Sequence, residues 1–149
     1  MAGSTLKIKI ESGGFGEWTR DLKADDLNRL EKSIGLEMAE IARDHIEEHK
    51  TPEGQQMKPW SEKYEKRVRD SGDRRDILMG PERRLHHSIS YMITNEGIYY
   101  GSNLVYAAVH QWGWKEKKIP ARPYLGMGPE EKQGIEDILE DFTVRLARV

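Results

Sequence analysis

The chain of 149 residues contains no cysteine, which excludes disulfide bonds, thiolate zinc sites and cysteine nucleophiles. Aliphatic residues are sparse too, since Leu, Ile, Val and Phe account for 30 residues while charged residues make up 34%. No apolar run approaches the roughly 18–20 residues of a membrane helix, so no membrane association is expected. A core with so few aliphatic side chains is thin, which suits a small subunit that gains stability from its neighbours.

The formal net charge of −2 conceals an uneven distribution along the chain. Residues 1–57 have a balance of −4, residues 58–87 of +3 and residues 129–149 of −3. Two interpretations remain open. The charges either form solvated faces without a partner, or they make a dipolar subunit that favours head-to-tail contact between identical copies.

The first half of the chain shows one strand pattern and one long helix pattern. Leu6, Ile8 and Ile10 alternate with lysines, which predicts a strand, and the glycines of residues 13–16 predict a turn. Apolar residues then recur at helical spacing from 27 to 46. Asp25 is the predicted N-cap of this helix, and the Thr51-Pro52 pair ends it, because the residue before proline avoids helical geometry.

The second half predicts shorter elements. Ser61 should cap a helix over 62–69, and a flexible loop is expected near 70–80, followed by a helical piece over 81–87. Residues 89–93 and 98–101 predict a hairpin, and residues 104–112 a helix that ends with Gly113 in the left-handed conformation. Pro129 suits the first position of a C-terminal helix with an apolar stripe.

These elements predict an α+β fold in a single domain over residues 1–149. Its small antiparallel sheet would combine the N-terminal strand with the hairpin. The long N-terminal helix and the C-terminal helix would pack on that sheet.

The segment from His45 to His49 matches the H-x-x-E-H pattern of inverted zinc proteases, in which two histidines bind one metal. However, His45 falls on the apolar stripe of its helix, and no third ligand can be identified. No serine shows a nucleophile-elbow pattern either. We therefore expect no catalytic residue, no metal, no cofactor and no small-molecule substrate.

The basic stretch over residues 58–84 includes Trp60 and Tyr64, a combination that could track phosphates and stack on bases. The alternative function is therefore a nucleic-acid-binding accessory domain. Six acidic residues in the same stretch weaken its field. A solvated loop ordered by a protein partner is the preferred interpretation, and direct DNA contact is not expected.

The segment 106–126 combines aromatic residues with a stiffened backbone. Pro120 and Pro123 fix φ and remove two backbone donors, so the chain is extended without needing strand pairing. Arg122 lies between them with five donors suited to a carboxylate, and aromatic residues surround it. Such a segment is either a recognition strip for another protein or a well-packed loop under the terminal helix.

The strings YAAVHQWG (106–113, from Tyr106) and IPARPYLG (119–126) resemble the phage virion morphogenesis family, the tail completion proteins of Mu-like and P2-like phages. Looser similarities follow in the same order along nearly the whole chain: a long N-terminal helix, a glycine-containing loop that ends at Trp60, a Ser88-Ile89 piece before a hairpin, and a C-terminal helix. The stretch over 80–85 departs from the pattern, because the family usually has a Thr/Ser-Gly-x-Leu run there.

The resemblance implies a structural assembly protein, not an enzyme, that completes the tail or the head–tail joint of a phage or prophage virion. Its expected partners are further copies of itself in a ring and other tail or neck proteins. It would act in the cytoplasm of the bacterial host during assembly and then remain in the virion. The predicted protein-interface residues are Trp112, Trp114, Arg122, Tyr124, Tyr106, His110, Gln111, Pro120 and Pro123.

Overall fold

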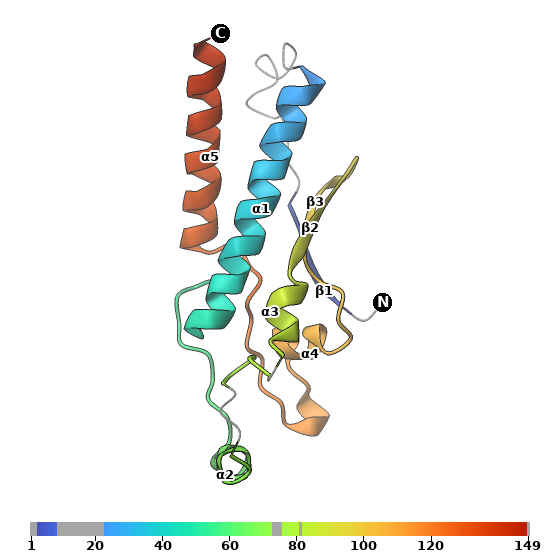
Figure 1. Ribbon diagram of the computed structural model, residues 1–149, viewed down its shortest axis with the longest axis vertical. Coiled ribbons are helices and arrows are strands. Elements are labelled where there is room, and N and C mark those ends of the chain that lie inside the picture. The colour runs from blue at the N-terminus through green and yellow to red at the C-terminus, as the bar shows by residue number, and fades with distance from the viewer. Residues whose placement is uncertain (1–2, 9–22, 73–75, 81, 149) are drawn as a thin grey trace.

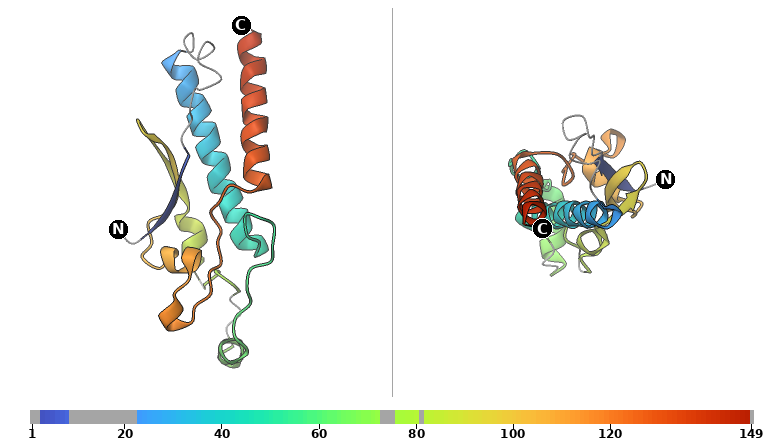
Figure 2. Two further views of the ribbon diagram at one scale, coloured as in Figure 1. Left: turned by 180° about the vertical axis from the view of Figure 1, so that it is seen from behind. Right: turned by 90° about the horizontal axis from the view of Figure 1, so that it is seen from above.

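The computed structural model describes residues 3–8, 23–72, 76–80 and 82–148. A small sheet, a long helix and a second long helix form three successive layers, and shorter elements gather at one end (Figures 1 and 2). The α+β class is therefore confirmed. In chain order the elements are β1 (Ser4–Ile8), α1 (Ala24–Glu48), α2 (Glu62–Asp70), α3 (Arg84–Ser88), β2 (Ser90–Thr94), β3 (Gly97–Ser102), α4 (Ala107–Trp112), a 3-10 turn (Lys115–Lys117) and α5 (Pro129–Ala147).

The three strands form one antiparallel sheet in the order β1-β3-β2. The predicted hairpin is confirmed as β2 and β3. The N-terminal strand begins at Ser4, two residues before the predicted start, and Ile10 and the predicted turn over 13–16 lie outside the described residues. In β3, Ile98, Tyr100 and Ser102 face inward and are almost completely buried.

Helix α1 covers the inner face of this sheet. Its residues Ile34, Met38 and Ile46 are at most 2% exposed and belong to the core. Gly35 permits the close approach, since a Cβ there would lie 2.5 Å from the Tyr91 ring of β2. Helix α1 therefore lies between the sheet and α5, and it packs against β2 and β3 on one side and against α5 on the other.

The ends of α1 differ in one respect from the prediction. Lys23 is the N-cap, without a side-chain capping bond, so the prediction of Asp25 as the cap is wrong. Asp25 and Asp26 instead lie in the first turn, where their charge favours the helix dipole. At the other end, His49 adopts the left-handed conformation and the chain leaves the helix before Thr51 and Pro52.

Helix α5 packs mainly against α1, which separates it from the sheet (Figure 2). The two helices approach at Gly134, where a Cβ would lie 3.1 Å from Cγ of Glu37. Pro129 occupies the first turn as predicted. The apolar stripe of α5 is half-buried and consists of Ile135, Ile138, Leu139, Phe142 and Leu146.

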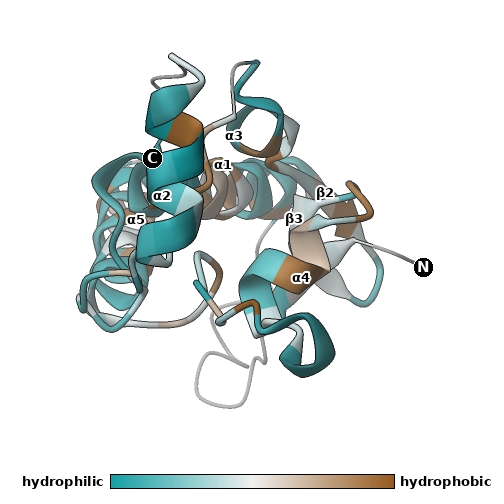
Figure 3. Ribbon diagram, turned by 90° about the horizontal axis from the view of Figure 1, so that it is seen from below, coloured by the Kyte–Doolittle hydropathy of each residue, from teal (hydrophilic) through white to brown (hydrophobic). Residues whose placement is uncertain are grey.

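The short helices α2, α3 and α4 gather at the end of the molecule away from the C-terminus (Figure 3). Ser61 caps α2 as predicted, accepting a hydrogen bond from the backbone N–H of Tyr64. The helices predicted to begin at 81 and 104 begin three residues later, at Arg84 and Ala107. Residues 73–75 of the predicted flexible loop lie outside the described residues.

Gly113 ends α4 but does not adopt the predicted left-handed helical conformation. Its φ of 77° is positive, while its ψ of 176° is extended. A Cβ at this position would lie 2.8 Å from Ile119 O and 2.8 Å from Ala121 N. Glycine is required because the returning proline segment crosses directly over the end of the helix.

Candidate protein-interaction site

The segment 106–126 follows the sheet with α4, turns at residues 114–119 and returns as an extended strip that runs from the lower end of the molecule toward the start of α5 (Figure 1). Its turn is closed by paired backbone hydrogen bonds between Trp114 and Ile119, at 2.8 and 3.0 Å. No strand among the described residues pairs with the strip, so other groups must satisfy its backbone.

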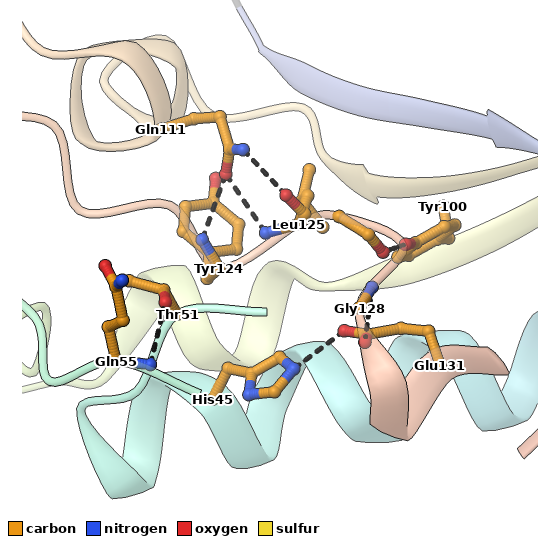
Figure 4. Close-up of polar contacts among 10 residues, drawn as sticks. His45, Thr51, Gln55, Tyr100, Gln111, Tyr124, Leu125, Gly128 and Glu131 are labelled. Carbon is orange, nitrogen blue, oxygen red and sulfur yellow. Dashed lines mark hydrogen bonds and ion pairs between the residues drawn. The ribbon is translucent and has the colours of Figure 1, made fainter. Parts of the chain in front are cut away.

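Gln111 of α4 supplies most of those groups (Figure 4). Its Oε1 accepts hydrogen bonds from the backbone N–H of Tyr124 and of Leu125, both at 3.1 Å. Its Nε2 donates to the carbonyl of Leu125 at 2.9 Å. One amide side chain thereby replaces a strand partner, and it fixes the strip at a set distance from the helix.

Tyr124 anchors the strip in the core. The side chain is completely buried, and its hydroxyl contacts the carbonyl of Ala107 at 3.2 Å and the hydroxyl of Ser4 in β1. Burial raises the pKa of the Tyr124 phenol to about 12, so the hydroxyl stays protonated. Tyr124 therefore connects the strip, α4 and the N-terminal strand.

Arg122 is also turned inward and is 6% exposed. It donates to the carbonyl of Lys58 at 2.6 Å and to that of Pro59 at 2.8 Å, while its backbone N–H bonds the carbonyl of His110 at 2.7 Å. Burial lowers the pKa of Arg122. The donors of Arg122 are suited to a carboxylate, but within this chain they bond two backbone carbonyls of the 52–60 loop.

Pro120 and Pro123 are half-buried in the strip. His110 lies in α4 with its ring edge-to-face against Tyr106, at 5.8 Å between centroids. Burial first, and then the charge of Arg122, lower the pKa of His110, so its neutral form is favoured near pH 7.

Three aromatic side chains of the same segment remain accessible. Trp112 is 64% exposed, Trp114 is 43% exposed and Tyr106 is 40% exposed. The ammonium group of Lys117 lies 5.8 Å from the centre of the Trp114 ring. The predicted interface residues thus fall into two sets: an inward-facing frame that includes the half-buried Gln111 and the buried Arg122 and Tyr124, and an exposed aromatic set at the two ends of α4 and the start of the turn.

A second polar contact joins α1 to α5 beside this frame (Figure 4). Nε2 of His45 lies 2.7 Å from Oε1 of Glu131, and both side chains are about 2–3% exposed. Burial opposes protonation of His45, but the hydrogen bond and charge of Glu131 outweigh it and raise the His45 pKa. The other Glu131 oxygen accepts the N–H of Gly128 at 3.1 Å, as in a capping box.

The sequence analysis missed the role of Glu131. Its position three residues after the N-cap Gly128 was the signal that could have found it. The pair also bears on the H-x-x-E-H pattern, because His45 is occupied by Glu131 and His49 has left the helix. Among the described residues, no cluster of three His, Asp or Glu side chains is placed to bind a metal ion.

In the described part of the basic stretch, aromatic and acidic side chains lie beside the basic ones. Trp60 and Tyr64 pack edge-to-face at 5.3 Å, and they line a hollow of about 410 Å³ together with Tyr106 and His110. Acidic partners accompany two of the arginines. Arg83 bonds Glu47 at 2.8 Å, and Arg84 bonds its near neighbour Glu82.

Comparisons with known proteins agree with the two strings that form this frame. The model of the phage virion morphogenesis family matches residues 15–143. The chain belongs to this family. A relative in Escherichia phage Mu, its putative capsid assembly protein G, is 31% identical over 157 residues, which cover 99% of this chain and 93% of the Mu protein.

Another relative of this virion morphogenesis protein is an uncharacterized protein of Methanocaldococcus jannaschii. It is 32% identical over 114 residues, which cover 74% of this chain and 82% of the archaeal protein. No solved structure gives a significant match. In the part of the chain that the structure describes, no helix combines the length and the apolar character needed to cross a bilayer.

Family membership assigns the protein to the assembly of a phage virion. The geometry adds that the family strings hold a rigid frame at one end of the molecule. Side chains far apart in the sequence meet there, with Ser4 and Tyr124 in contact across 120 positions.

Proposed function

We propose that this virion morphogenesis protein is a structural, non-catalytic component that completes the tail or the head–tail joint through protein–protein contacts. Its neighbours are other tail or neck proteins. It acts in the cytoplasm of the bacterial host during assembly and is retained in the virion. The similarity to a putative capsid assembly protein of phage Mu supports a place among the proteins that build the particle.

The observation that carries the proposal is the contrast within segment 106–126. The side chains of Gln111, Arg122 and Tyr124 form hydrogen bonds within the chain. Trp112 and Trp114, in contrast, extend from the same frame into solvent. Exposed tryptophans on a rigid support lose little conformational entropy when a partner covers them, and they are frequent anchors of protein interfaces.

A complementation experiment tests the proposal. A phage or prophage that lacks this gene is supplied with the wild-type protein or with the Trp112→Ser/Trp114→Ser variant, and particles are counted by plaque assay and electron microscopy. The double variant should fold and accumulate, yet leave DNA-filled heads and tails unjoined. The matched control is Met92→Ser, which removes a side chain that is 59% exposed on β2.

Plaque counts from the double tryptophan variant equal to those of wild type would overturn the proposal. Equal losses from the Met92→Ser control would overturn it as well, because the effect would then not belong to this surface. Thermal melting of the purified variants separates a folding defect from a joining defect.

A further inference from the structure

The exposed turn after α4 carries concentrated positive charge beside its tryptophans. We call Trp112, Trp114, Lys115, Lys117 and Lys118 the basic tip. All five side chains are exposed, and Glu116 is the single acid between the lysines. Lys117 lies over the Trp114 ring, and Lys115 and Lys118 extend from the 3-10 turn and its end. The tip therefore offers apolar rings within a cationic rim.

The opposite flank of the molecule carries the complementary charge. Helix α1 has eight acidic and three basic residues, and α5 has six acidic and two basic residues. Where the C-terminal half of α1 meets the first turn of α5, we call Asp44, Glu48 and Glu130 the acidic face; all three are exposed.

The carboxylates of this face influence one another. Burial first, and then the charges of Glu48, Glu47, Glu40 and Glu130, raise the pKa of Asp44. Three of these neighbours already have basic partners, since Glu40 bonds Arg43 at 2.6 Å, Glu47 bonds Arg83 at 2.8 Å and Glu48 lies 3.5 Å from Lys50. Among the described residues, Asp44 and Glu130 have no basic partner, and a cation from outside would relieve their negative charge.

A single copy cannot bring the two surfaces together. The tip lies at the lower end on the side of α4, whereas the acidic face belongs to α1 and α5 on the other flank, and both views show this separation (Figures 1 and 2). We propose that the basic tip of one copy docks on the acidic face of a second copy, in a head-to-tail contact.

This inference rests on the proposed structural function and names one of its partners, a further copy of the chain. Because the two contacting surfaces differ, a docked pair leaves the tip of one copy and the face of the other free. Repetition of such a contact gives a ring if the rotation closes and an open chain if it does not. Trp112 and Trp114 would supply the apolar area of the contact, and the charges would set orientation and encounter rate.

Two neutralised variants test the contact. Lys115→Gln/Lys118→Asn removes tip charge, with Asn chosen because Lys118 has a positive φ of 55° that Asn tolerates. Asp44→Asn/Glu48→Gln removes charge from the face. Sedimentation velocity at low salt should show self-association of the wild type, and each variant should weaken it at least about tenfold. Added salt should dissociate the wild type, because the Debye length falls to about 8 Å at physiological ionic strength.

Mixing separates head-to-tail contact from other arrangements. The tip variant keeps an intact face and the face variant keeps an intact tip, so an equimolar mixture should form a two-chain species and nothing larger. A contact with two-fold symmetry through the tip alone would be lost in the tip variant and not restored by mixing. The control Lys63→Gln/Lys66→Gln removes the same charge from exposed positions of α2 and should leave association unchanged.

A wild-type protein that stays monomeric at low salt and high concentration would overturn the inference, as would mixtures that stay monomeric. These results are distinguishable from failure of the proposed function. A monomeric protein that still joins heads to tails refutes only the self-contact. A protein that self-associates as described, but whose tip variants yield normal particles, refutes the role in joining.

Discussion

Gln111 allows a quantitative test of the frame. Replacement by alanine removes three hydrogen bonds: two from the backbone N–H groups of Tyr124 and Leu125, and one to the carbonyl of Leu125. These backbone groups belong to a strip that pairs with none of the three described strands. The substitution therefore leaves them without their partner, instead of exchanging one partner for another.

The magnitude follows from the number of bonds. A net contribution of about 1 kcal/mol for each hydrogen bond gives a loss of about 3 kcal/mol. Water that reaches the half-buried site compensates part of this, so we expect Gln111→Ala to lower the free energy of unfolding by about 2–3 kcal/mol. For a domain of this size the melting temperature should fall by roughly 5–10 °C.

Urea denaturation with an unchanged m-value measures this loss. Gln133→Ala is the matched control, because Gln133 makes one exposed hydrogen bond to Asp137 and its removal should cost less than about 0.5 kcal/mol. A loss at Gln111 no larger than at the control would refute the view that this amide supports the strip.

Gln111→Glu adds a signature in pH. An ionised carboxylate would keep accepting from the two N–H groups, but one oxygen would face the Leu125 carbonyl in place of the donor Nε2. The folded-state pKa of Glu at 111 should therefore exceed its unfolded value of about 4.3. The free energy of unfolding of this variant should be greatest below the unfolded pKa of about 4.3, and it should fall as pH rises through the folded pKa.

Three further predictions concern stability. The pKa of His45 is raised, so the His45–Glu131 pair stabilises the fold fully below the unfolded pKa of 6.5, and this stabilisation is lost as pH rises through the folded pKa. In urea denaturation at a series of pH values, His45→Gln should abolish this decline in stability. An identical decline in the variant would contradict the assignment to His45. Gly128→Ala places a Cβ 1.9 Å from Pro52 O and should lower the free energy of unfolding by more than about 2 kcal/mol. In the control Gly80→Ala the new Cβ meets nothing within 4 Å, so the free energy of unfolding should change by less than about 0.5 kcal/mol. Equal melting temperatures of the two variants would show that the backbone at Gly128 shifts without cost. Trp112→Ser should change the unfolding free energy by less than about 1 kcal/mol despite its effect on assembly, and a larger loss would place its ring in the core.

The sequence by itself determined the elements that depend on local pattern. Periodicity of 3.6 residues located α1 and α5, alternation located the hairpin, and Ser61 capped α2 where its side chain can reach its own helix. The strings around Gln111 and Arg122 were sufficient to indicate the family. Helix starts were less accurate at α3 and α4, where the chain follows its tertiary contacts and the local signal is short.

Only the tertiary structure decided which way the side chains of segment 106–126 face. Proline fixes φ at positions 120 and 123, but it does not decide whether Arg122 points to another protein or to the carbonyls of Lys58 and Pro59, which lie over 60 positions away. The pairing of His45 with Glu131 spans 86 positions and likewise follows from the packing of α5 on α1. Local conformation is set by steric limits within a few residues, whereas burial and hydrogen-bond pairing depend on which distant segments the fold brings into contact.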